Sequence, residues 1–290
     1  MSSVSVITDS NSGISQEQAK ELGIRILPMP FYINGKEYTD GITLSQDTFY
    51  EMLNKGYEVA TSQPSAGDLI EAWEDELKTH DEVIYIPMSS GLSSSLQTAK
   101  TFCADYDGRV QVADNQRISV TQRFSAIEAK KMADKGKSAA EIKEFLESTR
   151  FDSSIYIMVD TMTYLKKGGR VTPAAATFAE ILNIKPVLQI QGDKLDSFAK
   201  ARGCKAAKKI MINAIKDDIE KRFGGIDPDN PKVEIEVAHT MNHEAAVALL
   251  EELKEIFPNH PTNLDPLSLS VACHIGPGAL AIATSVIHDI

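Results

Sequence analysis

The sequence predicts an α/β protein with two domains, and three observations support this fold class. The chain has 290 residues, which is more than one compact core usually needs and suits two. Its composition, with 42% hydrophobic and 24% charged residues, is that of a globular protein rather than a disordered or fibrous one. In the first half, short β-favouring segments alternate with helical ones, which indicates a mostly parallel sheet with helices on its faces.

The first elements follow from local sequence. Residues 4–7 are β-favouring and predict a strand that ends at the polar stretch 8–10. Ser15 is placed to cap a helix over 16–22. Residues 24–32 are extended in character but carry two prolines, so we expect an edge strand or a loop there rather than a central strand.

The remainder of the first half continues this alternation. Asn34-Gly35 predicts a hairpin turn. Leu69, Trp73 and Leu77 share one face of a predicted helix, and the single tryptophan is assigned to core packing. Strands are expected over 82–87 and 109–113, and helices over 43–55, 65–78, 121–135 and 139–150 and in the stretch that ends near 106.

A change in this pattern near residue 150 divides the chain into two predicted domains. Residues 1–150 form the first α/β domain, and residues 151–290 form a second one in which helices and strands are more loosely spaced. The turn-rich segment 223–231 lies inside the second domain and is expected to be a surface loop. Strands in this half are expected over 154–159, 187–190, 194–198, 233–238 and 268–273.

Charge and cysteine content exclude several classes of function. The formal net charge of −11 argues against a surface that attracts nucleic acid or anionic membranes as a whole. The three cysteines, Cys103, Cys204 and Cys273, form no CxxC pair, so neither a disulfide framework nor a zinc site is expected. The chain shows no signal peptide and no apolar run of about 18 residues, so we expect a cytoplasmic protein without stable membrane insertion.

Hydroxyl side chains are concentrated at two predicted helix starts. One group is TSQPS at 61–65, and the other is SSGLSSS at 89–95, which follows a predicted strand. Hydroxyls and free backbone N–H groups at a helix N-terminus suit an anion such as a carboxylate or a phosphate. The alternative is that these residues only cap their helices. Neither a Walker A sequence nor the glycine motif of dinucleotide-binding folds is present, so a nucleotide site finds no support.

Ser93 and His274 suggest an alternative function, that of a hydrolase or acyl-transfer enzyme with a serine nucleophile. Against it, Ser93 does not lie in a GxSxG elbow, and His274 has no assignable acidic partner. His274 precedes a glycine-rich turn at 275–279, at the end of a predicted strand, where open α/β sheets place ligands. His239 and His243 lie four residues apart without a third ligand, so no metal site is expected.

The segment 161–209 is basic within an acidic chain. It carries ten basic and three acidic residues, a net charge of +7. Such a segment suits a phosphate group or an acidic partner, because arginine makes forked contacts to phosphate. Arg170 follows two glycines and Arg202 precedes one, which distinguishes them from the lysines within 205–209, which are assigned to a solvated helix face.

Seven short motifs occur in an order that is typical of one family. They are TDS at 8–10, TSQPS at 61–65, SSGLS at 89–93, LKKGGRV at 165–171, IKP at 184–186, ARG at 201–203 and HIGPGA at 274–279. Each motif is weak alone, but their joint order is specific. By these motifs the chain resembles the DegV family over nearly its whole length.

The resemblance implies a two-domain DegV-like fold that holds one long-chain fatty acid in a tunnel between the domains. In the bacterial fatty acid kinase system, such proteins present the carboxyl group of the fatty acid to a separate ATP-dependent kinase subunit and carry away the acyl phosphate. The TSQPS and SSGLS head-group loops then belong to domain 1–150, and the GGRV, ARG and HIGPGA motifs belong to domain 151–290.

The resemblance also implies residue roles, with no catalytic residue, no metal and no cofactor apart from the bound fatty acid. One departure concerns the SSGLSGT sequence that the family usually has, where this chain has Ser94 in place of glycine and Ser95 in place of threonine. A side chain at 94 changes how closely a head group approaches the backbone. The expected carboxylate-binding residues are Thr61, Ser93, Ser62, Ser94 and His274, and those expected to face the phosphate or the kinase are Arg170 and Arg202.

We therefore expect a lipid-binding carrier rather than an enzyme, with the chemistry in a partner kinase. Phe178, Ile181 and Leu182 follow the GGRV motif at helical spacing and are candidates for the apolar sleeve, with core packing as the alternative. Two other functions stay open: the serine-dependent enzyme, and a lipid-sensing regulatory module whose basic segment binds an acidic protein. DNA binding is disfavoured by the acidic charge.

Overall fold

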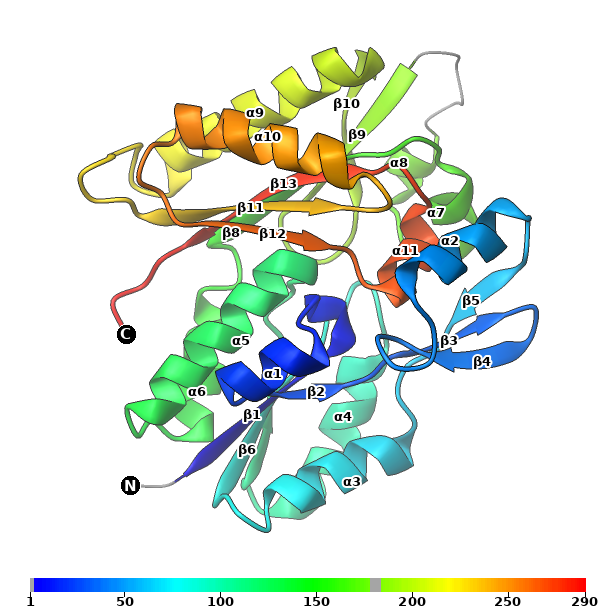
Figure 1. Cartoon of the computed structure of the whole chain (residues 1–290). Helices are drawn as coiled ribbons and strands as arrows, with labels where there is room; N and C mark the ends of the chain where they lie inside the picture. Colours follow the sequence, from blue (N-terminus) through cyan, green and yellow to red (C-terminus); the bar gives the residue numbers. More distant parts are fainter. Residues whose placement is uncertain (1–2, 178–183) are drawn as a thin grey trace. The chain divides into compact units, whose positions relative to one another are not determined.

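The computed structural model describes residues 3–177 and 184–290 (Figure 1). Its internal contacts divide the chain into two compact units. Unit 1 takes the residues up to Arg150 together with Ser268–Ser270 and Ile290, and unit 2 takes Phe151–Leu267 and Val271–Asp289. Three consecutive residues from late in the sequence therefore pack with unit 1. In the described part of the chain, no helix is both long enough and apolar enough to cross a membrane.

Unit 1 is built on a four-stranded parallel sheet with the strand order β2-β1-β6-β7. Its strands are β1 (Val4–Asp9), β2 (Arg25–Leu27), β6 (Glu82–Ile86) and β7 (Val110–Val112). The helices around it are α1 (Gln16–Leu22), α3 (Ala66–Glu76), α4 (Ser95–Cys103), α5 (Ser119–Asp134) and α6 (Ala139–Ser148). The predicted parallel sheet with flanking helices is confirmed.

Helices cover both faces of this sheet because its strands carry apolar side chains on both sides. Val6 and Ile84 belong to one buried cluster with residues of α5 and α6. Ile7 and Tyr85, one position further along the same strands, belong to a second cluster with residues of α3 and α4. Trp73 lies in this second cluster and is fully buried, which confirms its predicted place in the core.

A smaller antiparallel sheet of unit 1 has the order β4-β3-β5 and carries the helix α2 (Gln46–Asn54) in one of its connections. Asn34 and Gly35 join β3 to β4 with positive φ angles, as the predicted hairpin turn requires. The expectation for 24–32 is right for β2, an edge strand, and wrong for β3, which is central. Proline is tolerated there because Pro30 is the first residue of the strand. The strands are β3 (Pro30–Ile33), β4 (Lys36–Thr39) and β5 (Val59–Thr61).

Unit 2 contains a six-stranded mixed sheet with the order β10-β9-β8-β13-β11-β12, in which only β11 and β12 pair in parallel. The helices α9 (Gly203–Arg222) and α10 (His243–Ile256) lie along one face of this sheet and share a buried cluster with it (Figure 1). Two short helices, α7 (Thr163–Gly168) and α8 (Pro173–Ala176), also belong to unit 2, together with all but the first two residues of α11 (Leu269–Ile275). The strands are β8 (Ser153–Met158), β9 (Ile184–Ile190), β10 (Asp196–Arg202), β11 (Val233–His239), β12 (Thr262–Pro266) and β13 (Leu280–Val286).

The predicted strand over 268–273 is wrong, because this segment forms α11. Leu269, Ala272 and Cys273 are buried, and their spacing of three and four residues suits one face of a helix rather than the alternation of a strand. His274 consequently lies in the last turn of a helix. The glycine-rich turn therefore follows a helix and leads into the strand β13, whereas we expected it to follow a strand.

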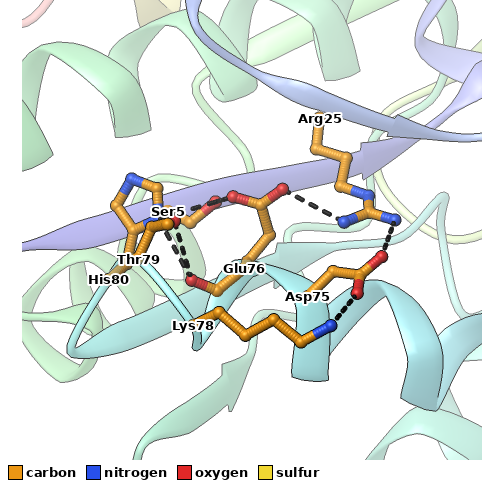
Figure 2. A network of polar contacts seen from close by, with 7 residues as sticks. All are labelled: Ser5, Arg25, Asp75, Glu76, Lys78, Thr79 and His80. Atoms are coloured by element: carbon orange, nitrogen blue, oxygen red, sulfur yellow. Dashed lines mark hydrogen bonds and ion pairs between the residues drawn. The ribbon is translucent and has the colours of Figure 1, made fainter.

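A polar network at the end of α3 ties this helix to β1 and β2 of unit 1 (Figure 2). The Glu76 carboxylate accepts a hydrogen bond from the Ser5 hydroxyl at 2.8 Å and one from Arg25 at 3.1 Å. His80 Nδ1 lies 3.4 Å from the same carboxylate, and Arg25 also reaches Asp75 at 3.3 Å. These groups are partly exposed, so each ion pair contributes little, about 0–1 kcal/mol.

Asp9 is a fully buried carboxylate at the C-terminal end of β1. It accepts hydrogen bonds from the backbone N–H of Met88 at 2.8 Å, the backbone N–H of Asn11 at 3.0 Å and the side-chain amide of Gln122 at 3.1 Å. Burial raises the pKa of Asp9 to about 6, although these three donors oppose the shift. Asp9 thus joins the end of β1 to the segment after β6 and to α5.

The raised pKa of Asp9 predicts a pH-dependent term in the stability of the protein. Because the pKa of Asp9 in the folded protein lies above its ordinary value of 3.8, protonated Asp9 stabilises the fold relative to ionised Asp9. This stabilisation is fully present below pH 3.8 and is lost as the pH rises through about 6. The free energy of unfolding of the wild type, taken relative to Asp9→Asn, should fall by roughly 2 kcal/mol between pH 4 and pH 7. Denaturant unfolding at unit pH intervals measures this difference.

The exposed carboxylate of Asp134 provides a matched control. Asp134→Asn removes the same charge from the surface of α5 and should show no comparable trend relative to the wild type. A difference between the wild type and Asp9→Asn that is constant or rising over this pH range would contradict the assignment to Asp9.

Candidate functional site

The first hydroxyl-rich loop connects β5 to α3 in unit 1. Thr61 is the last residue of β5 and pairs with Phe31 across the small sheet. The Ser62 backbone N–H donates to the Pro30 carbonyl at 3.2 Å, which continues this pairing by one residue. Ser65 caps α3 by accepting the backbone N–H of Asp68 at 3.0 Å. Thr61 and Ser62 are partly buried at the point where a strand gives way to a loop.

The second hydroxyl-rich loop connects β6 to α4 in the same unit. Ser89 is fully buried, and its hydroxyl accepts the backbone N–H of Gly91 at 3.2 Å. The hydroxyl of Ser93, which is partly buried, accepts the N–H of Ser95 at 3.1 Å. Ser94 occupies the N-cap position of α4 but makes no capping bond with its side chain. The loop is therefore ordered by its own hydroxyls, and simple N-capping does not account for Ser94.

Gln63 joins the two loops. Its side-chain oxygen accepts hydrogen bonds from the hydroxyl of Ser94 at 3.0 Å and from that of Thr98 at 3.2 Å, and its nitrogen lies 3.0 Å from the Thr98 hydroxyl. The TSQPS and SSGLSSS loops thus meet in unit 1, through a hydrogen bond between residues that are 31 positions apart in sequence. Sequence reasoning missed Gln63 as an individual residue, although it stands at the centre of the TSQPS motif.

The chemistry that this part of unit 1 offers is hydrogen bonding by neutral groups. Thr61, Ser62, Ser93 and Ser94 supply hydroxyls, each able to donate one hydrogen bond. The Ser95 hydroxyl is buried and has no hydrogen-bond partner among the described residues. Neutral donors suit a carboxylate, since they bind its oxygens without the desolvation cost of burying a second charge.

Sequence reasoning also missed a buried polar cluster in unit 1 that holds the start of α11. The Asp40 carboxylate accepts the Leu269 backbone N–H at 3.1 Å and the Ser10 hydroxyl at 3.0 Å. Asn11 accepts a hydrogen bond from the hydroxyl of Ser270. Burial raises the pKa of Asp40. The only sequence signal for this cluster was the TDS motif. Asp40 and Ser270 are 230 residues apart, so no local pattern connects them.

His274 lies in unit 2, at the end of α11, with its ring against Gly168 of α7. A Cβ atom on Gly168 would lie 3.0 Å from His274 Cε1 and 3.2 Å from its Cγ, and closer still to Nδ1. Burial, and secondarily the positive charge of Arg170, lower the pKa of His274 to about 4. At neutral pH the imidazole is therefore uncharged and offers one donor and one acceptor.

Two more glycines let the turn after α11 approach its neighbours in unit 2. A Cβ atom on Gly276 would overlap the ring of Tyr164, 2.6 Å from its Cε2. A Cβ atom on Gly278 would lie 2.5 Å from a carboxylate oxygen of Asp160. The HIGPGA turn and the segment 160–168 are thus packed at closer range than side chains allow, which explains why glycine stands at these positions.

The two arginines that we singled out lie in unit 2. Arg170 is partly buried and donates a hydrogen bond to the Gly168 carbonyl. Arg202 is exposed at the end of β10 and at the N-cap position of α9. The candidate site residues thus fall into two sets, with Thr61, Ser62, Ser93 and Ser94 in unit 1 and His274, Arg170 and Arg202 in unit 2. The sleeve candidates Phe178, Ile181 and Leu182 lie outside the described residues.

The His239 and His243 rings lie 5.4 Å apart, centre to centre, at the junction of β11 and α10. Burial lowers the pKa of His239, and the neighbouring His243 adds to this shift. Over residues 3–177 and 184–290, the structure shows no group of three or more side chains able to hold a metal ion.

The link between the two hydroxyl loops gives a testable prediction for Gln63. Gln63→Ala removes the acceptor of the Ser94 and Thr98 hydroxyls, so we expect a loss of about 1–3 kcal/mol in the free energy of unfolding. Denaturant unfolding measures the loss. Gln97→Ala is the matched control, because Gln97 is exposed on α4 and its side chain makes no recorded hydrogen bond in the described structure. Equal stability of Gln63→Ala and Gln97→Ala would show that the link is unimportant.

Known proteins of similar sequence place the chain in a family. It matches the family described as "Uncharacterised protein, DegV family" over residues 3–286. A DegV domain-containing protein of Clostridium perfringens is 30% identical over 285 residues, which cover 96% of this chain and 95% of the relative. Protein DegV of Bacillus subtilis is 29% identical over 283 residues, covering 96% and 98%.

Solved structures of similar fold agree with this match. A DegV family protein from Thermus thermophilus, described by its fatty acid binding, has a TM-score of 0.88 at 27% identity, with 98% of this chain and 100% of the other covered. DegV of Bacillus subtilis, described as a fatty acid binding protein, has a TM-score of 0.86 at 27% identity, with 99% and 100% covered. Since the family match runs through both units from residue 3 to residue 286, this protein belongs to the DegV family.

Proposed function

We propose that the protein binds a long-chain fatty acid and holds its carboxylate by the hydroxyl-rich loops of unit 1. Two structures of similar fold, both 27% identical to this chain, are described by fatty acid binding. The observation that carries the proposal for this chain is the Gln63 link, which brings the TSQPS and SSGLSSS loops together. Thr61 and Ser93 are the proposed carboxylate donors, with Ser62, Ser94 and His274 as further contacts.

Neutral hydroxyl donors suit a carrier that must release its fatty acid, because they hold the carboxylate less tightly than a cation does. An arginine would hold a carboxylate by a strong bidentate pair and would have to be displaced before the head group could react. Hydroxyls hold the carboxylate by single hydrogen bonds, each contributing about 1.5–3 kcal/mol, without the second bond and the opposite charge that an arginine adds. The acyl chain contributes most of the affinity, since each buried methylene adds about 0.8 kcal/mol.

We further propose that the bound fatty acid is presented to a separate ATP-dependent kinase, which forms the acyl phosphate. The sequence has neither a Walker A loop nor the glycine motif of dinucleotide-binding folds, so ATP chemistry is assigned to the partner. The carrier then contributes orientation and shielding of the carboxyl group. Arg170 and Arg202 are the residues proposed to face the phosphoryl group or the kinase.

Extraction of lipid from the purified protein tests the binding proposal. Protein from a bacterial host should release about one fatty acid per chain on denaturation and solvent extraction, as measured by mass spectrometry. The variant Thr61→Ala/Ser93→Ala should carry at least tenfold less after exchange against excess carrier lipid, because two head-group hydrogen bonds are lost. Ser148→Ala is the control, since its exposed hydroxyl at the end of α6 bonds only to its own helix.

Equal lipid content in all three proteins would move the head group away from Thr61 and Ser93. Absence of fatty acid from the wild type, with its fold intact by circular dichroism, would overturn the binding proposal. The serine-enzyme alternative predicts ester or acyl phosphate hydrolysis by the isolated protein that is lost in Ser93→Ala, whereas the carrier shows no such turnover.

If Arg202 faces the kinase, its substitution should impair presentation of the fatty acid to the kinase but not binding of the fatty acid. Arg202→Ala should lower ATP-dependent acyl phosphate formation with the kinase about tenfold while leaving the affinity for fatty acid unchanged, because one exposed charge-assisted contact is lost. Lys209→Ala removes an exposed charge from α9, the helix that follows Arg202, and should have no effect. A fall in fatty acid affinity in Arg202→Ala, or an equal fall in turnover in Lys209→Ala, would contradict this role.

A further inference from the structure

We propose that Gly168 is a positioning residue that fixes the imidazole of His274 beside the guanidinium of Arg170. Unit 2 would then present a neutral hydrogen-bonding ring, which suits the carboxylate, next to a permanent cation, which suits the phosphoryl group that is added to it. This inference rests on the proposed function for its ligand, whereas the positioning itself stands on the contacts of three residues.

The first contact is steric. Gly168 ends α7, and the His274 ring occupies the space that a side chain at 168 would fill, with Cε1 3.0 Å and Cγ 3.2 Å from the site of a Cβ atom. Real Cβ atoms essentially never come as close as the Nδ1 atom would be. Any other residue at 168 therefore forces the ring to move.

The backbone at Gly168 does not itself require glycine. Its φ is not in the left-handed region, unlike that of Gly169, which has a φ of +67° and no neighbour in the space of a Cβ atom. Glycine is disfavoured within helices, and Gly168 belongs to α7. The lack of a side chain at 168 is thus explained by the His274 ring, whereas at 169 it is explained by the turn.

The second contact is a hydrogen bond. The Gly168 carbonyl accepts a hydrogen bond from the Arg170 guanidinium, two residues along the chain. One residue therefore contacts His274 through its α-carbon and Arg170 through its oxygen. The position of Gly168 therefore bears on the distance between the imidazole and the guanidinium.

The backbone after His274 is also packed closely against α7. Two residues after His274, Gly276 packs against the ring of Tyr164, which lies one helical turn before Gly168 in α7. The backbone that follows His274 therefore lies close against α7. Burial and the charge of Arg170 lower the pKa of His274 to about 4. At physiological pH the imidazole of His274 is therefore neutral, beside the positively charged guanidinium of Arg170.

The test is a double-mutant cycle with Gly168→Ala and His274→Ala. Gly168→Ala alone should lower the melting temperature and raise the pKa of His274 towards 6.5, measured by NMR, because the ring leaves its buried place beside Arg170. Combined with His274→Ala, the same substitution should cost nothing or stabilise α7. Gly67→Ala is the control, since Gly67 lies in α3 with only an ordinary contact of 3.6 Å at its Cβ site.

An equal loss of stability from Gly168→Ala in the presence and absence of His274 would overturn the proposal, as would an unchanged His274 pKa in a folded Gly168→Ala protein. If Gly168→Ala does not fold, Arg170→Gln provides the second variant. It should raise the pKa of His274 without altering Gly168, and an unchanged pKa would show that the two side chains are not held together.

Fatty acid affinity separates this inference from the proposed function. In a wild type that binds fatty acid, Gly168→Ala should weaken binding about tenfold, the loss expected for one hydrogen bond. If the wild type binds no fatty acid, the proposed function fails, yet the thermal and NMR measurements on the unliganded protein still decide whether Gly168 positions the pair. Unchanged affinity with a shifted His274 pKa would remove His274 from the ligand site and overturn the functional part of the inference.

Discussion

The rest of unit 1 depends on the hydrogen bonds that the buried carboxylate of Asp9 accepts. Their donors are neutral groups, not cations. The three donors come from the residue after next in its own chain, from the segment after β6 and from α5, so one side chain fixes the C-terminal edge of the parallel sheet. Met88, one of these donors, immediately precedes the SSGLSSS loop, and Asn11, another, also binds Ser270 through its side chain. The proposed carboxylate site therefore stands on backbone that Asp9 holds in place. Open α/β sheets commonly place ligands at this edge, outside the carboxyl ends of their strands.

The two units position their functional side chains by different physical means. Unit 1 uses hydrogen bonds between side chains, such as those of Gln63 with Ser94 and Thr98, which tolerate small movements of the loops. Unit 2 uses the absence of side chains, since Gly168 and Gly276 admit rings at distances where no Cβ atom fits. Hydrogen-bonded loops can adapt to a head group that arrives and leaves, whereas close packing fixes a ring in one place. The division suits the proposed carrier, in which the loops of unit 1 would take up and release the head group while unit 2 would keep a constant electrostatic environment.

The sequence was sufficient to predict what local chemistry and short-range order determine. The parallel sheet, the cap at Ser15 and the hairpin at Asn34-Gly35 are all present, because each depends on residues within a few positions of one another. The helix α11 was predicted as a strand, and its start is held by Asp40, which lies 229 residues earlier in the sequence. Asp9 and Asp40 were missed as buried groups, because carboxylates without a cation are usually exposed. The hydrogen bonds of Gln63 could not be predicted from the sequence either, because the partners of a glutamine side chain are determined only when the chain has folded.

The departure of this chain from the usual SSGLSGT sequence has a physical consequence at the proposed head-group loop. Ser94 has φ −81° and ψ 0°, a conformation open to any residue, so glycine is not required there by the backbone. Its hydroxyl donates to Gln63 Oε1, a hydrogen bond that glycine cannot make. The substitution therefore adds a tether between the two loops, and the hydroxyl at 94 is already engaged before any ligand arrives. With this hydroxyl engaged, Thr61 and Ser93 remain the proposed direct donors to the carboxylate, and the proposed contact from Ser94 would require its hydrogen bond to Gln63 to break.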